Sequence, residues 1–498
     1  MDMALDMKYF EEMEAKIPHG KVRTRFAPSP TGYMHVGNLR TALYTWLIAR
    51  NAGGTFILRI EDTDQGRLVE GATDVIYRTL AECRLDHDEG PDVGGPVAPY
   101  IQSERRDTYG KYARLLVEKG HAYYCFCEKT ESEEDSGDFD RAADPCRDIP
   151  LEEALARVEA GEPYVIRQKI PAEGSTTFHD AIFGDITVEN NTLDDQVLIK
   201  RDGMPTYNFA NVIDDHLMGI THVVRGSEYL SSAPKYNLLY EGFGWEVPVY
   251  VHCSPVMRDA QNKMSKRHGD PSYEDLKAQG FLTDAILNYV ALLGWSPRGE
   301  LAEQEVFSLE ELARAFDLNG MSKSPAIFDI EKLTHFNALY LRSMAPEDFA
   351  KVAEPYIRSV VKDESLSVSA IAALLQARCE KLTDIPEKVD FFQALPEYGL
   401  DLFTNKKSKT NPEVCKTMLE AAVPMLEGLS DWNQEAIHDG LIALAEQLGV
   451  KNATLMWPVR IAAAGKAVTP GGAVEICQIL GKDETLRRLK LGLEKLNV

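Results

Sequence analysis

The sequence has no stretch of about 18 consecutive apolar residues, which is the length that a membrane-spanning helix requires. We therefore expect no membrane partner. Residues 1–16 alternate acidic with apolar side chains, and they lack both the apolar core of a secretory signal and the Arg-rich, acid-poor character of an organellar address. These absences predict a cytoplasmic protein. Its 498 residues exceed the size at which a single hydrophobic core stops growing, so we expect several domains.

Cysteine is scarce as well. Eight cysteines in so long a chain, most of them at scattered positions such as Cys83 and Cys379, do not form the pattern of a disulfide framework. We expect most of them to be reduced and buried.

Positive charge is limited, because the net charge is −24. This balance excludes a protein that binds nucleic acid with its whole surface, since phosphate binding depends on Lys and Arg displacing counterions. Any RNA contact must be local. Basic clusters occur at residues 258–267, 406–409 and 487–495. A solvated helix face would explain each cluster taken alone.

The first ordered segment predicts a β-turn-α unit. Residues 22–27 have the pattern of a strand, residues 28–32 form a Pro/Gly turn, and the apolar residues that follow recur at helical spacing. A second strand is predicted at 55–60 and a helix at 75–85. Strands that alternate with helices are typical of a parallel α/β sheet.

The middle of the chain is less regular. Residues 131–148 are acidic and contain Gly, which favours an insertion, and strand-like runs follow at 164–170 and 185–188. Short apolar segments at 197–200 and 222–225 are expected to re-enter the first sheet. After about residue 332 the pattern is almost wholly helical, with amphipathic segments at 371–379, 435–448 and 474–480. A separate all-α part is therefore expected.

The turn after the first strand suits a nucleotide phosphate. A helix that begins directly after a tight turn presents free backbone N–H groups and the positive end of its dipole. His35 can donate a hydrogen bond there, and Gly37 allows close approach of the backbone. The P-loop pattern G-x-x-x-x-G-K and the dinucleotide pattern G-x-G-x-x-G are both absent from this turn. A helix-entry histidine with a structural role is the alternative for His35 alone.

The full string at residues 27–38, A-P-S-P-T-G-Y-M-H-V-G-N, is more specific. It resembles the HIGH signature of class I aminoacyl-tRNA synthetases, in the form typical of the bacterial-type glutamyl-tRNA synthetases. The resemblance implies that Pro28, His35, Gly37 and Asn38 bind ATP, accompanied by Mg²⁺, and that His35 and Gly37 contribute to catalysis.

Residues 263–267, K-M-S-K-R, supply mobile cations for the negative charge that develops on the phosphates during adenylate formation. They resemble the KMSKS signature of the same class, which implies catalytic roles for Lys263 and Lys266 and ATP contacts from Met264, Ser265 and Arg267. A near match at residues 321–324, M-S-K-S, lacks the leading lysine and precedes a compact apolar turn. It is interpreted as a structural helix boundary, and it resembles a segment of the domain that contacts the tRNA stem.

A pocket for free glutamate needs about two cations and one anion, because glutamate carries two carboxylates and one ammonium. In a parallel sheet, ligands collect at the carboxyl ends of the strands. The family resemblance assigns the pocket to Arg25, Ala27, Ser29, Glu61, Tyr207, Asn211 and Arg225. Glu61 and Ser29 are expected to hold the ammonium, Arg25 with Tyr207 the side-chain carboxylate, and Arg225 with Asn211 the α-carboxylate. Surface or ion-pair roles are the alternative for each residue.

A zinc site is a further hypothesis. Cys125, Cys127, Cys146 and Asp148 form two short ligand spacings within the insertion, which is compatible with a four-ligand structural Zn²⁺ site. The pattern resembles the zinc element of some glutamate-branch enzymes, although the fourth ligand and the connecting stretch differ. Reduced cysteines without metal are the alternative.

The resemblance spans nearly the whole chain and implies a multidomain α/β plus all-α fold. Residues 1–101 and 205–256 are predicted to form a Rossmann-type parallel-sheet catalytic domain. Residues 102–204 are predicted to form an inserted α+β connective domain that binds the acceptor end. A stem-contact domain with the lysine loop is predicted at 257–343, and a helical anticodon-binding region at 344–498.

The implied activity is ATP-dependent activation of L-glutamate to glutamyl-adenylate, followed by transfer to the 3′ end of tRNA(Glu) by a monomer. One alternative is a non-discriminating enzyme that also glutamylates tRNA(Gln). Others are a paralogue that modifies a tRNA base, an adenylyltransferase that does not use tRNA, and an inactive RNA-binding paralogue.

Overall fold

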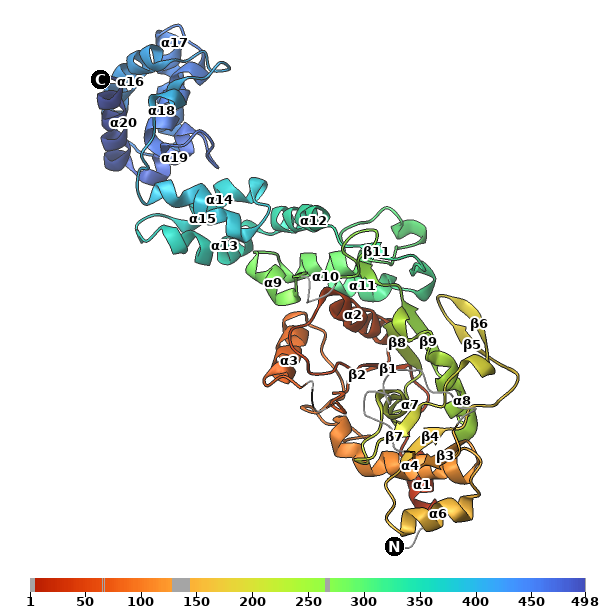
Figure 1. Cartoon of the computed structure of the whole chain (residues 1–498). Helices are drawn as coiled ribbons and strands as arrows, with labels where there is room; N and C mark the ends of the chain where they lie inside the picture. The colour runs from red at the N-terminus through yellow and green to blue at the C-terminus, as the bar shows by residue number, and fades with distance from the viewer. Residues whose placement is uncertain (1–4, 65, 67, 128–143, 265–268, 498) are drawn as a thin grey trace. The chain divides into compact units, whose positions relative to one another are not determined.

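The computed structural model describes residues 5–64, 66, 68–127, 144–264 and 269–497. The chain divides into two compact units (Figure 1). The first comprises Met1–Leu276 and Ile286–Asp329, and the second comprises Lys277–Ala285 and Ile330–Val498. In the described part of the chain, no helix is long and apolar enough to cross a membrane.

The first unit is built around a parallel sheet, as predicted. Its strands lie in the order β2 (Thr55–Leu58), β1 (Arg23–Phe26), β8 (His222–Gly226) and β9 (Val249–Cys253), and all these neighbours pair in parallel. Segments some 200 residues apart in sequence therefore lie side by side, with Thr24 opposite His222. The carboxyl ends of β1, β8 and β9 meet at one edge, where ligands of such sheets bind.

An antiparallel hairpin extends this sheet beyond β9. It consists of β5 (Ser175–Asp180) and β6 (Gly184–Glu189), and it joins β9 where Asp180 lies opposite Tyr250 (Figure 1). The hairpin comes from the predicted insertion, so the insertion contributes two strands to the main sheet.

The prediction for residues 197–200 was wrong. Strand β7 (Val197–Ile199) belongs to a separate antiparallel sheet with β3 (Ala122–Cys125) and β4 (Val165–Gln168), in the order β3-β4-β7. A short, apolar run in the sequence predicts a buried strand, but it does not specify which sheet the strand joins. Residues 222–225 do re-enter the first sheet, as β8.

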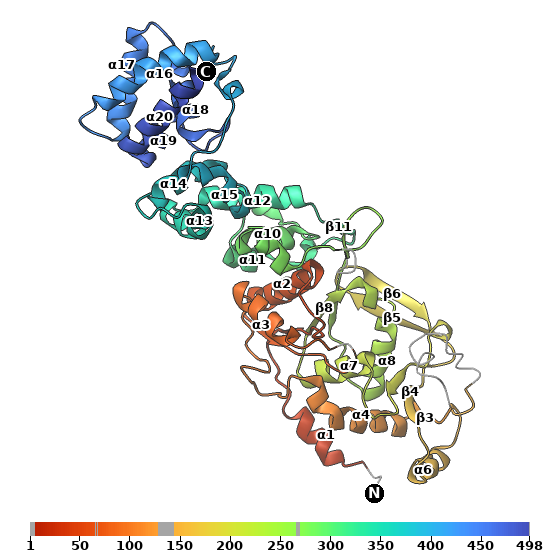
Figure 2. The same cartoon turned by 60° about the vertical axis from the view of Figure 1, so that its left-hand side comes forward.

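Helices pack against both sheets of the first unit, and one hydrophobic cluster runs through α4, α7, α8 and the strands they contact (Figure 2). The helices are α1 (Met7–Glu14), α2 (Val36–Asn51), α3 (Ala72–Glu82), α4 (Arg106–Glu118), α6 (Leu151–Glu159), α7 (Tyr207–Leu217), α8 (Ala233–Phe243) and α11 (Leu309–Ala315). A short parallel pair, β10 (Val256–Met257) and β11 (Ala326–Ile327), completes the strands. The chain passes between the two units within α9 (Tyr273–Ala278), within α10 (Thr283–Leu292) and again between Asp329 and Ile330.

The second unit is helical in its described residues, as predicted. Its helices are α12 (Ile330–Ser343), α13 (Pro346–Val360), α14 (Val368–Leu375), α15 (Ile385–Val389), α16 (Pro412–Glu427), α17 (Gln434–Gln447), α18 (Asn452–Ala464), α19 (Ala473–Leu480) and α20 (Lys482–Leu496). Apolar residues of α13 to α20 form one continuous core. The amphipathic segments recognised in the sequence correspond to α14 with the turn that follows it, α17 and α19.

The basic cluster at 487–495 serves this packing. Arg488 is buried, and its Nη1 donates hydrogen bonds to the backbone carbonyls of Phe391 and Ala463 at 2.7 and 2.8 Å. Lys490 pairs with Glu427, and Lys495 lies over the ring of Tyr398. Much of this cluster's charge is therefore engaged within the unit itself.

Glu484 gives the second unit a pH-dependent contribution to stability. The pKa of Glu484 is lowered from 4.5 to about 2, mainly by the hydrogen bond from Arg487 and to a smaller extent by the one from Arg488. A carboxyl whose pKa is lowered by folding stabilises the native state above its unfolded pKa, and that contribution is lost as the pH falls toward the folded pKa. We expect Glu484→Gln to lower the unfolding temperature of this unit by about 2–4 °C at pH 7.

Scanning calorimetry of the full chain measures this difference, which should shrink progressively below about pH 4.5. Glu494→Gln, at an exposed position of the same helix, is the matched control. A difference for Glu484→Gln that stays constant down to pH 3 would contradict this account.

Candidate active site

A cavity of about 560 Å³ opens at the carboxyl edge of the parallel sheet. Arg25 and Phe26 reach it from the end of β1, Arg225 and Gly226 from β8, and Cys253 from β9. The predicted site residues that line it are Arg25, Ala27, Pro28, Ser29, His35, Gly37, Asn38, Glu61, Tyr207, Arg225, Lys263 and Met264. Residues as far apart in sequence as Arg25 and Met264 thus share one cavity.

The turn that enters α2 is closed by a local hydrogen bond. His35 is the N-cap of α2, and its Nδ1 accepts a hydrogen bond from the backbone N–H of Gly37 at 3.0 Å. A Cβ at position 37 would lie 3.2 Å from this nitrogen, so glycine relieves a tight contact. His35 therefore has a structural role as the cap of the helix. It also lines the cavity, where its contact with ATP remains a prediction.

The first part of the lysine loop also reaches the cavity. Lys263 and Met264 line it, and Met264 is buried. Ser265, Lys266 and Arg267 lie outside the described residues. Lys323, in the look-alike segment, is exposed and donates to the carbonyl of Phe183 at 3.3 Å, and it does not line the cavity.

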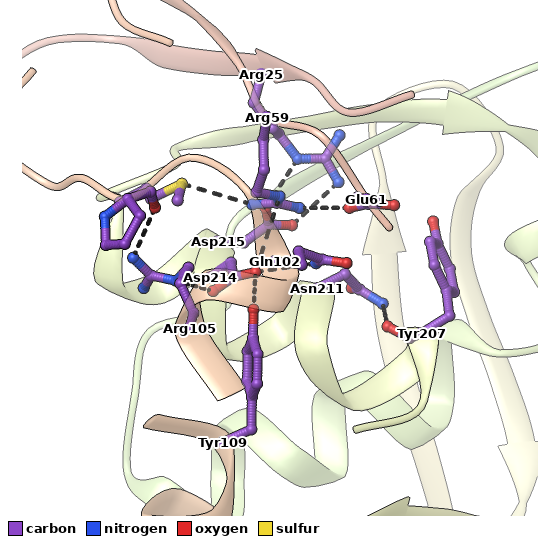
Figure 3. A network of polar contacts seen from close by, with 12 residues as sticks. Arg25, Arg59, Glu61, Gln102, Arg105, Tyr109, Tyr207, Asn211, Asp214 and Asp215 are labelled. Atoms are coloured by element: carbon purple, nitrogen blue, oxygen red, sulfur yellow. Dashed lines mark hydrogen bonds and ion pairs between the residues drawn. The ribbon is translucent and has the colours of Figure 1, made fainter. Parts of the chain in front are cut away.

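A buried charge network lies beneath the cavity and was missed from the sequence (Figure 3). Asp215 of α7 accepts hydrogen bonds from Nε and Nη2 of Arg25 at 2.9 and 3.0 Å, and from Nη1 of Arg59 at 2.7 Å. Nη2 of Arg59 in turn donates to Glu61 at 2.8 Å. Burial alone would raise the pKa of Asp215, but the two guanidinium groups hold it below its usual value.

The neighbouring Asp214 extends the network to the inserted segment. It accepts hydrogen bonds from Arg105, Gln102 and Tyr109 at 2.6–2.9 Å (Figure 3). Two adjacent acidic residues inside an apolar helix, at 214 and 215, were the available signal, because buried carboxylates require partners.

The two pocket arginines differ in the hydrogen bonds that they make within the protein. Arg25 uses all three of its nitrogens internally, because Nη1 donates to the carbonyl of Val224 at 3.2 Å in addition to the bonds with Asp215. Arg225 is 5% exposed, and its Nε donates a hydrogen bond to Nε2 of His252 at 3.2 Å. Among the described residues, Nη1 and Nη2 of Arg225 have no hydrogen-bond partner. Arg225 therefore offers free donors to the cavity.

Glu61 is the buried anion of the cavity. It is 4% exposed, and burial raises its pKa although Arg59 and Arg25 oppose the shift. Its bond to Arg59 uses Oε1. Tyr207 lines the wall nearby, where its ring packs 5.3 Å from that of Tyr229.

Asn211 is the one predicted glutamate-pocket residue that is not part of the cavity lining. It is buried in α7, its amide donates to the carbonyl of Tyr207 at 2.7 Å, and it does not line the cavity (Figure 3). Its predicted contact with a carboxylate stays a prediction. Sequence reasoning also missed several lining residues that lie outside the motifs, among them Arg40, Thr41, Tyr229 and Ser254.

A second group of polar side chains lies near the start of the insertion. Ligand atoms of Cys125, Cys127, Asp144 and Cys146 all lie within 4.8 Å of one another. Three of the separations are 3.3 Å for Cys125 to Asp144, 3.6 Å for Cys127 to Asp144 and 3.7 Å for Cys127 to Cys146. Ligands of a tetrahedral Zn²⁺ ion lie about 3.5–3.8 Å apart, given its usual bond lengths, so the four groups fit this metal.

The prediction of Asp148 as the fourth ligand was wrong. The Asp148 side chain is 90% exposed and pairs with Lys169 at 3.3 Å. Asp144 faces the cysteines instead, because its Oδ1 accepts the backbone N–H of Cys146 and so turns the carboxylate toward them. This turn geometry is not visible in the ligand spacing.

Comparisons with known proteins agree with this geometry. Residues 21–335 match the family model "tRNA synthetases class I (E and Q), catalytic domain", and residues 348–493 match "Anticodon binding domain". A glutamate–tRNA ligase from Clostridium tetani is 56% identical over 96% of this chain and 98% of its own length. One from Clostridium acetobutylicum is 55% identical over 96% and 99%.

A solved structure is also similar. The crystal structure of a glutamate tRNA ligase from Elizabethkingia meningosepticum, in complex with its amino acid, is 37% identical with a TM-score of 0.86 and covers 96% of this chain and 100% of that chain. The parallel sheet, its cavity and the helical unit are thus those of a class I tRNA synthetase, the family to which this chain belongs. Within that class it is a member of the glutamate–tRNA ligases.

The Asp215 network makes a prediction about stability. Asp215→Asn removes the charge that balances Arg25 and Arg59 in a buried position. We expect the unfolding free energy of the first unit to fall by about 3 kcal/mol, since breaking a buried ion pair leaves uncompensated charge. Urea denaturation followed by circular dichroism measures the change.

Asp86→Asn, at an exposed position of the same unit, is the control and should change the unfolding free energy by less than about 0.5 kcal/mol. An equally small effect for Asp215→Asn would show that the network does not stabilise the fold.

Proposed function

We propose that the cavity binds L-glutamate and ATP with Mg²⁺, forms glutamyl-adenylate, and transfers the glutamyl group to the 3′ end of tRNA(Glu). The observation that carries this proposal is the charge arrangement of the cavity. Three buried guanidinium groups, Arg25, Arg40 and Arg225, and one buried carboxylate, Glu61, line a space that also contains the entrance of α2. Nη1 and Nη2 of Arg40 donate to the backbone carbonyls of Leu293 and Ser254, so we assign the ligand to Arg25, Arg225 and Glu61. This set matches the two carboxylates and one ammonium of free glutamate.

Within this arrangement, Glu61 and Ser29 bind the ammonium. Arg225 offers the stronger site for a carboxylate, because its outer nitrogens are not engaged elsewhere. Arg25 and Tyr207 bind the second carboxylate, with Arg25 using hydrogens that remain after its bonds to Asp215 and Val224. Which of the two carboxylates each arginine binds is part of the proposal, with the side-chain carboxylate assigned to Arg25.

ATP is proposed to lie along the turn before α2, where Pro28, His35, Gly37 and Asn38 line the cavity. The dipole of α2 and the cations of the lysine loop stabilise the negative charge that develops on the α-phosphate and on departing pyrophosphate. Lys263, Lys266 and Arg267 supply this charge, and Met264 and Ser265 complete the loop. No covalent enzyme intermediate is required, because positioning and charge stabilisation carry both steps.

The tRNA is proposed to contact several parts of the chain. The acceptor end binds residues 102–204, the stem binds 257–343, and the anticodon binds the helical region 344–498. The last of these regions overlaps the matched anticodon-binding domain at residues 348–493. A cytoplasmic location fits a chain whose eight cysteines are all free, and we propose that the chain acts as a monomer.

We also propose that Cys125, Cys127, Asp144 and Cys146 hold a structural Zn²⁺ ion. Bound zinc would link β3 to the segment at 144–146 and so fix the base of the insertion. Three thiolates and one carboxylate leave no open coordination position, which is typical of a structural rather than a catalytic zinc.

The proposed activity is tested by glutamate-dependent acylation of separate tRNA(Glu) and tRNA(Gln) transcripts. We expect acylation of tRNA(Glu), and a loss of at least about 100-fold in kcat on Lys266→Ala, because a cation aimed at developing charge typically contributes this much. Lys323→Ala, in the look-alike segment that does not line the cavity, is the matched control and should keep the wild-type KM for ATP. Acylation of tRNA(Gln) as well would identify the non-discriminating enzyme, and acylation of neither transcript would refute the proposal.

The zinc proposal predicts about one zinc ion per chain after a chelator wash, measured by elemental analysis. Asp144→Ala should lower the retained zinc several-fold, because it removes one of four ligands. Asp148→Ala, four residues further along the chain at an exposed position, should retain the wild-type zinc content. Wild-type protein that retains well under one zinc per chain would rule out the site.

A further inference from the structure

A buried line of three side chains runs behind the cavity wall from the β5–β6 hairpin to Arg225. Oδ2 of Asp180, the last residue of β5, lies 2.6 Å from Nδ1 of His252 on β9. Nε2 of His252 lies 3.2 Å from Nε of Arg225 on β8. Asp180 and His252 are both 0% exposed. Neither residue lines the cavity, so neither touches a ligand bound there.

The two neighbours fix the protonation of the imidazole. Nε of an arginine is always a donor, so Nε2 of His252 must carry a lone pair to accept from it. Nδ1 then carries the hydrogen and donates to the Asp180 carboxylate. The imidazole is therefore a neutral ring in one tautomer, set by a carboxylate on one side and a guanidinium on the other.

The surroundings favour the same neutral form. Burial lowers the pKa of His252, while the hydrogen bond with Asp180 opposes the shift. The other charged or titratable groups that face the ring are Arg225, Glu228 and Tyr250, of which Arg225 also lowers the pKa of His252.

Asp180 is itself held firmly. Its Oδ1 accepts the backbone N–H groups of Ile182 and Phe183 at 2.9 and 2.8 Å, and its Oδ2 accepts the backbone N–H of His252 at 3.1 Å. The carboxylate is thus fixed by the turn of the hairpin and by the adjacent strand. An anchored acceptor of this kind fixes the orientation of a ring that donates to it.

Among the described residues, the guanidinium of Arg225 makes a hydrogen bond through Nε but none through Nη1 or Nη2. Its Nε points back to His252, while Nη1 and Nη2 have no hydrogen-bond partner among the described residues. The rings of Tyr236, Tyr229 and Tyr250 lie 4.5, 5.4 and 5.5 Å from its central carbon and confine the group. Without an acceptor at Nε, the buried N–H would be unsatisfied, and rotation of the group toward another acceptor would become favourable.

We infer that His252, oriented by Asp180, is a positioning residue that aims Nη1 and Nη2 of Arg225 at a carboxylate of the amino acid substrate. This inference rests on the proposed function and adds to it the two residues that preorganise the carboxylate site. The hairpin of the insertion thereby contributes to amino acid binding through Asp180, although it lies outside the cavity.

Two substitutions of His252 separate its two hydrogen bonds. The amide of His252→Gln reaches the place of Nε2, so it can accept from Arg225 but loses the bond from Nδ1 to Asp180. The amide of His252→Asn reaches only the place of Nδ1, so it keeps the bond to Asp180 and leaves Nε of Arg225 without an acceptor. The two variants therefore distinguish positioning of Arg225 from anchoring of the hairpin.

The measurement is the KM for glutamate and for ATP in aminoacylation of tRNA(Glu) by the full chain. We expect His252→Asn to raise the glutamate KM by about tenfold or more, the usual effect of losing a hydrogen bond to a charged group, with the ATP KM unchanged within about twofold. His252→Gln should recover most of the wild-type glutamate KM. His179→Asn, whose side chain is 70% exposed on the same hairpin, is the control and should match wild type.

Several results would overturn the inference. These are a larger glutamate KM effect for His252→Gln than for His252→Asn, equal increases in the KM for glutamate and for ATP, or wild-type kinetics in both variants. Thermal unfolding of each variant is measured beside the kinetics. If neither His252 variant folds, Asp180→Ala, which removes the acceptor for Nδ1, must raise the glutamate KM more than the ATP KM. Failure to do so also overturns the inference. Wild-type protein that acylates no tRNA would refute the proposed function instead, so the two failures are distinguishable.

Discussion

The carboxylate of Asp215 links β1, the segment after β2 and α7 through buried ion pairs. It accepts hydrogen bonds from Arg25 at the end of β1 and from Arg59 just after β2, while it belongs to α7, more than 150 residues later. Both guanidinium groups are almost completely buried, and a buried cation requires a paired anion. Arg59 in turn bonds Glu61, so the position of the cavity's anion also depends on this carboxylate. The strands and the helix can therefore pack only in an arrangement that brings these charges together.

The two pocket arginines differ in how many of their nitrogen atoms are already hydrogen-bonded within the protein. Each nitrogen of Arg25 already makes a hydrogen bond within the fold, whereas Nη1 and Nη2 of Arg225, which lines the cavity, have no partner among the described residues. His252 and Asp180 supply that single engagement from behind the wall. A site built in this way is preorganised, because the donors are oriented before a ligand arrives and cannot turn to satisfy themselves elsewhere.

Much of the fold could be predicted because its signals are local. The turn and helix at 28–51 follow from a Pro/Gly cluster and apolar residues at helical spacing, and α17 and α19 follow from their periodicity. The errors fall where partners are distant. Residues 197–199 are buried as expected, but their pairing with β4 depends on a register that no short run specifies. Asp144 rather than Asp148 faces the three cysteines because of one backbone hydrogen bond in a turn.

By itself, the sequence determined the strand, turn and helix at the start of the fold, the α/β class of the first unit and the helical second unit, because each is signalled by a pattern in contiguous residues. Only the tertiary structure decided which arginine retains free donors, which aspartate joins the cysteines, and that Asp180 and His252 support Arg225. The hydrogen-bond partners of the two arginines are 27 to 199 residues away along the chain, and Asp144 meets Cys127 and Cys125 across 17 and 19 residues. These side chains meet only in the folded interior. There, each buried polar group must be satisfied by whichever partner the packing brings within reach.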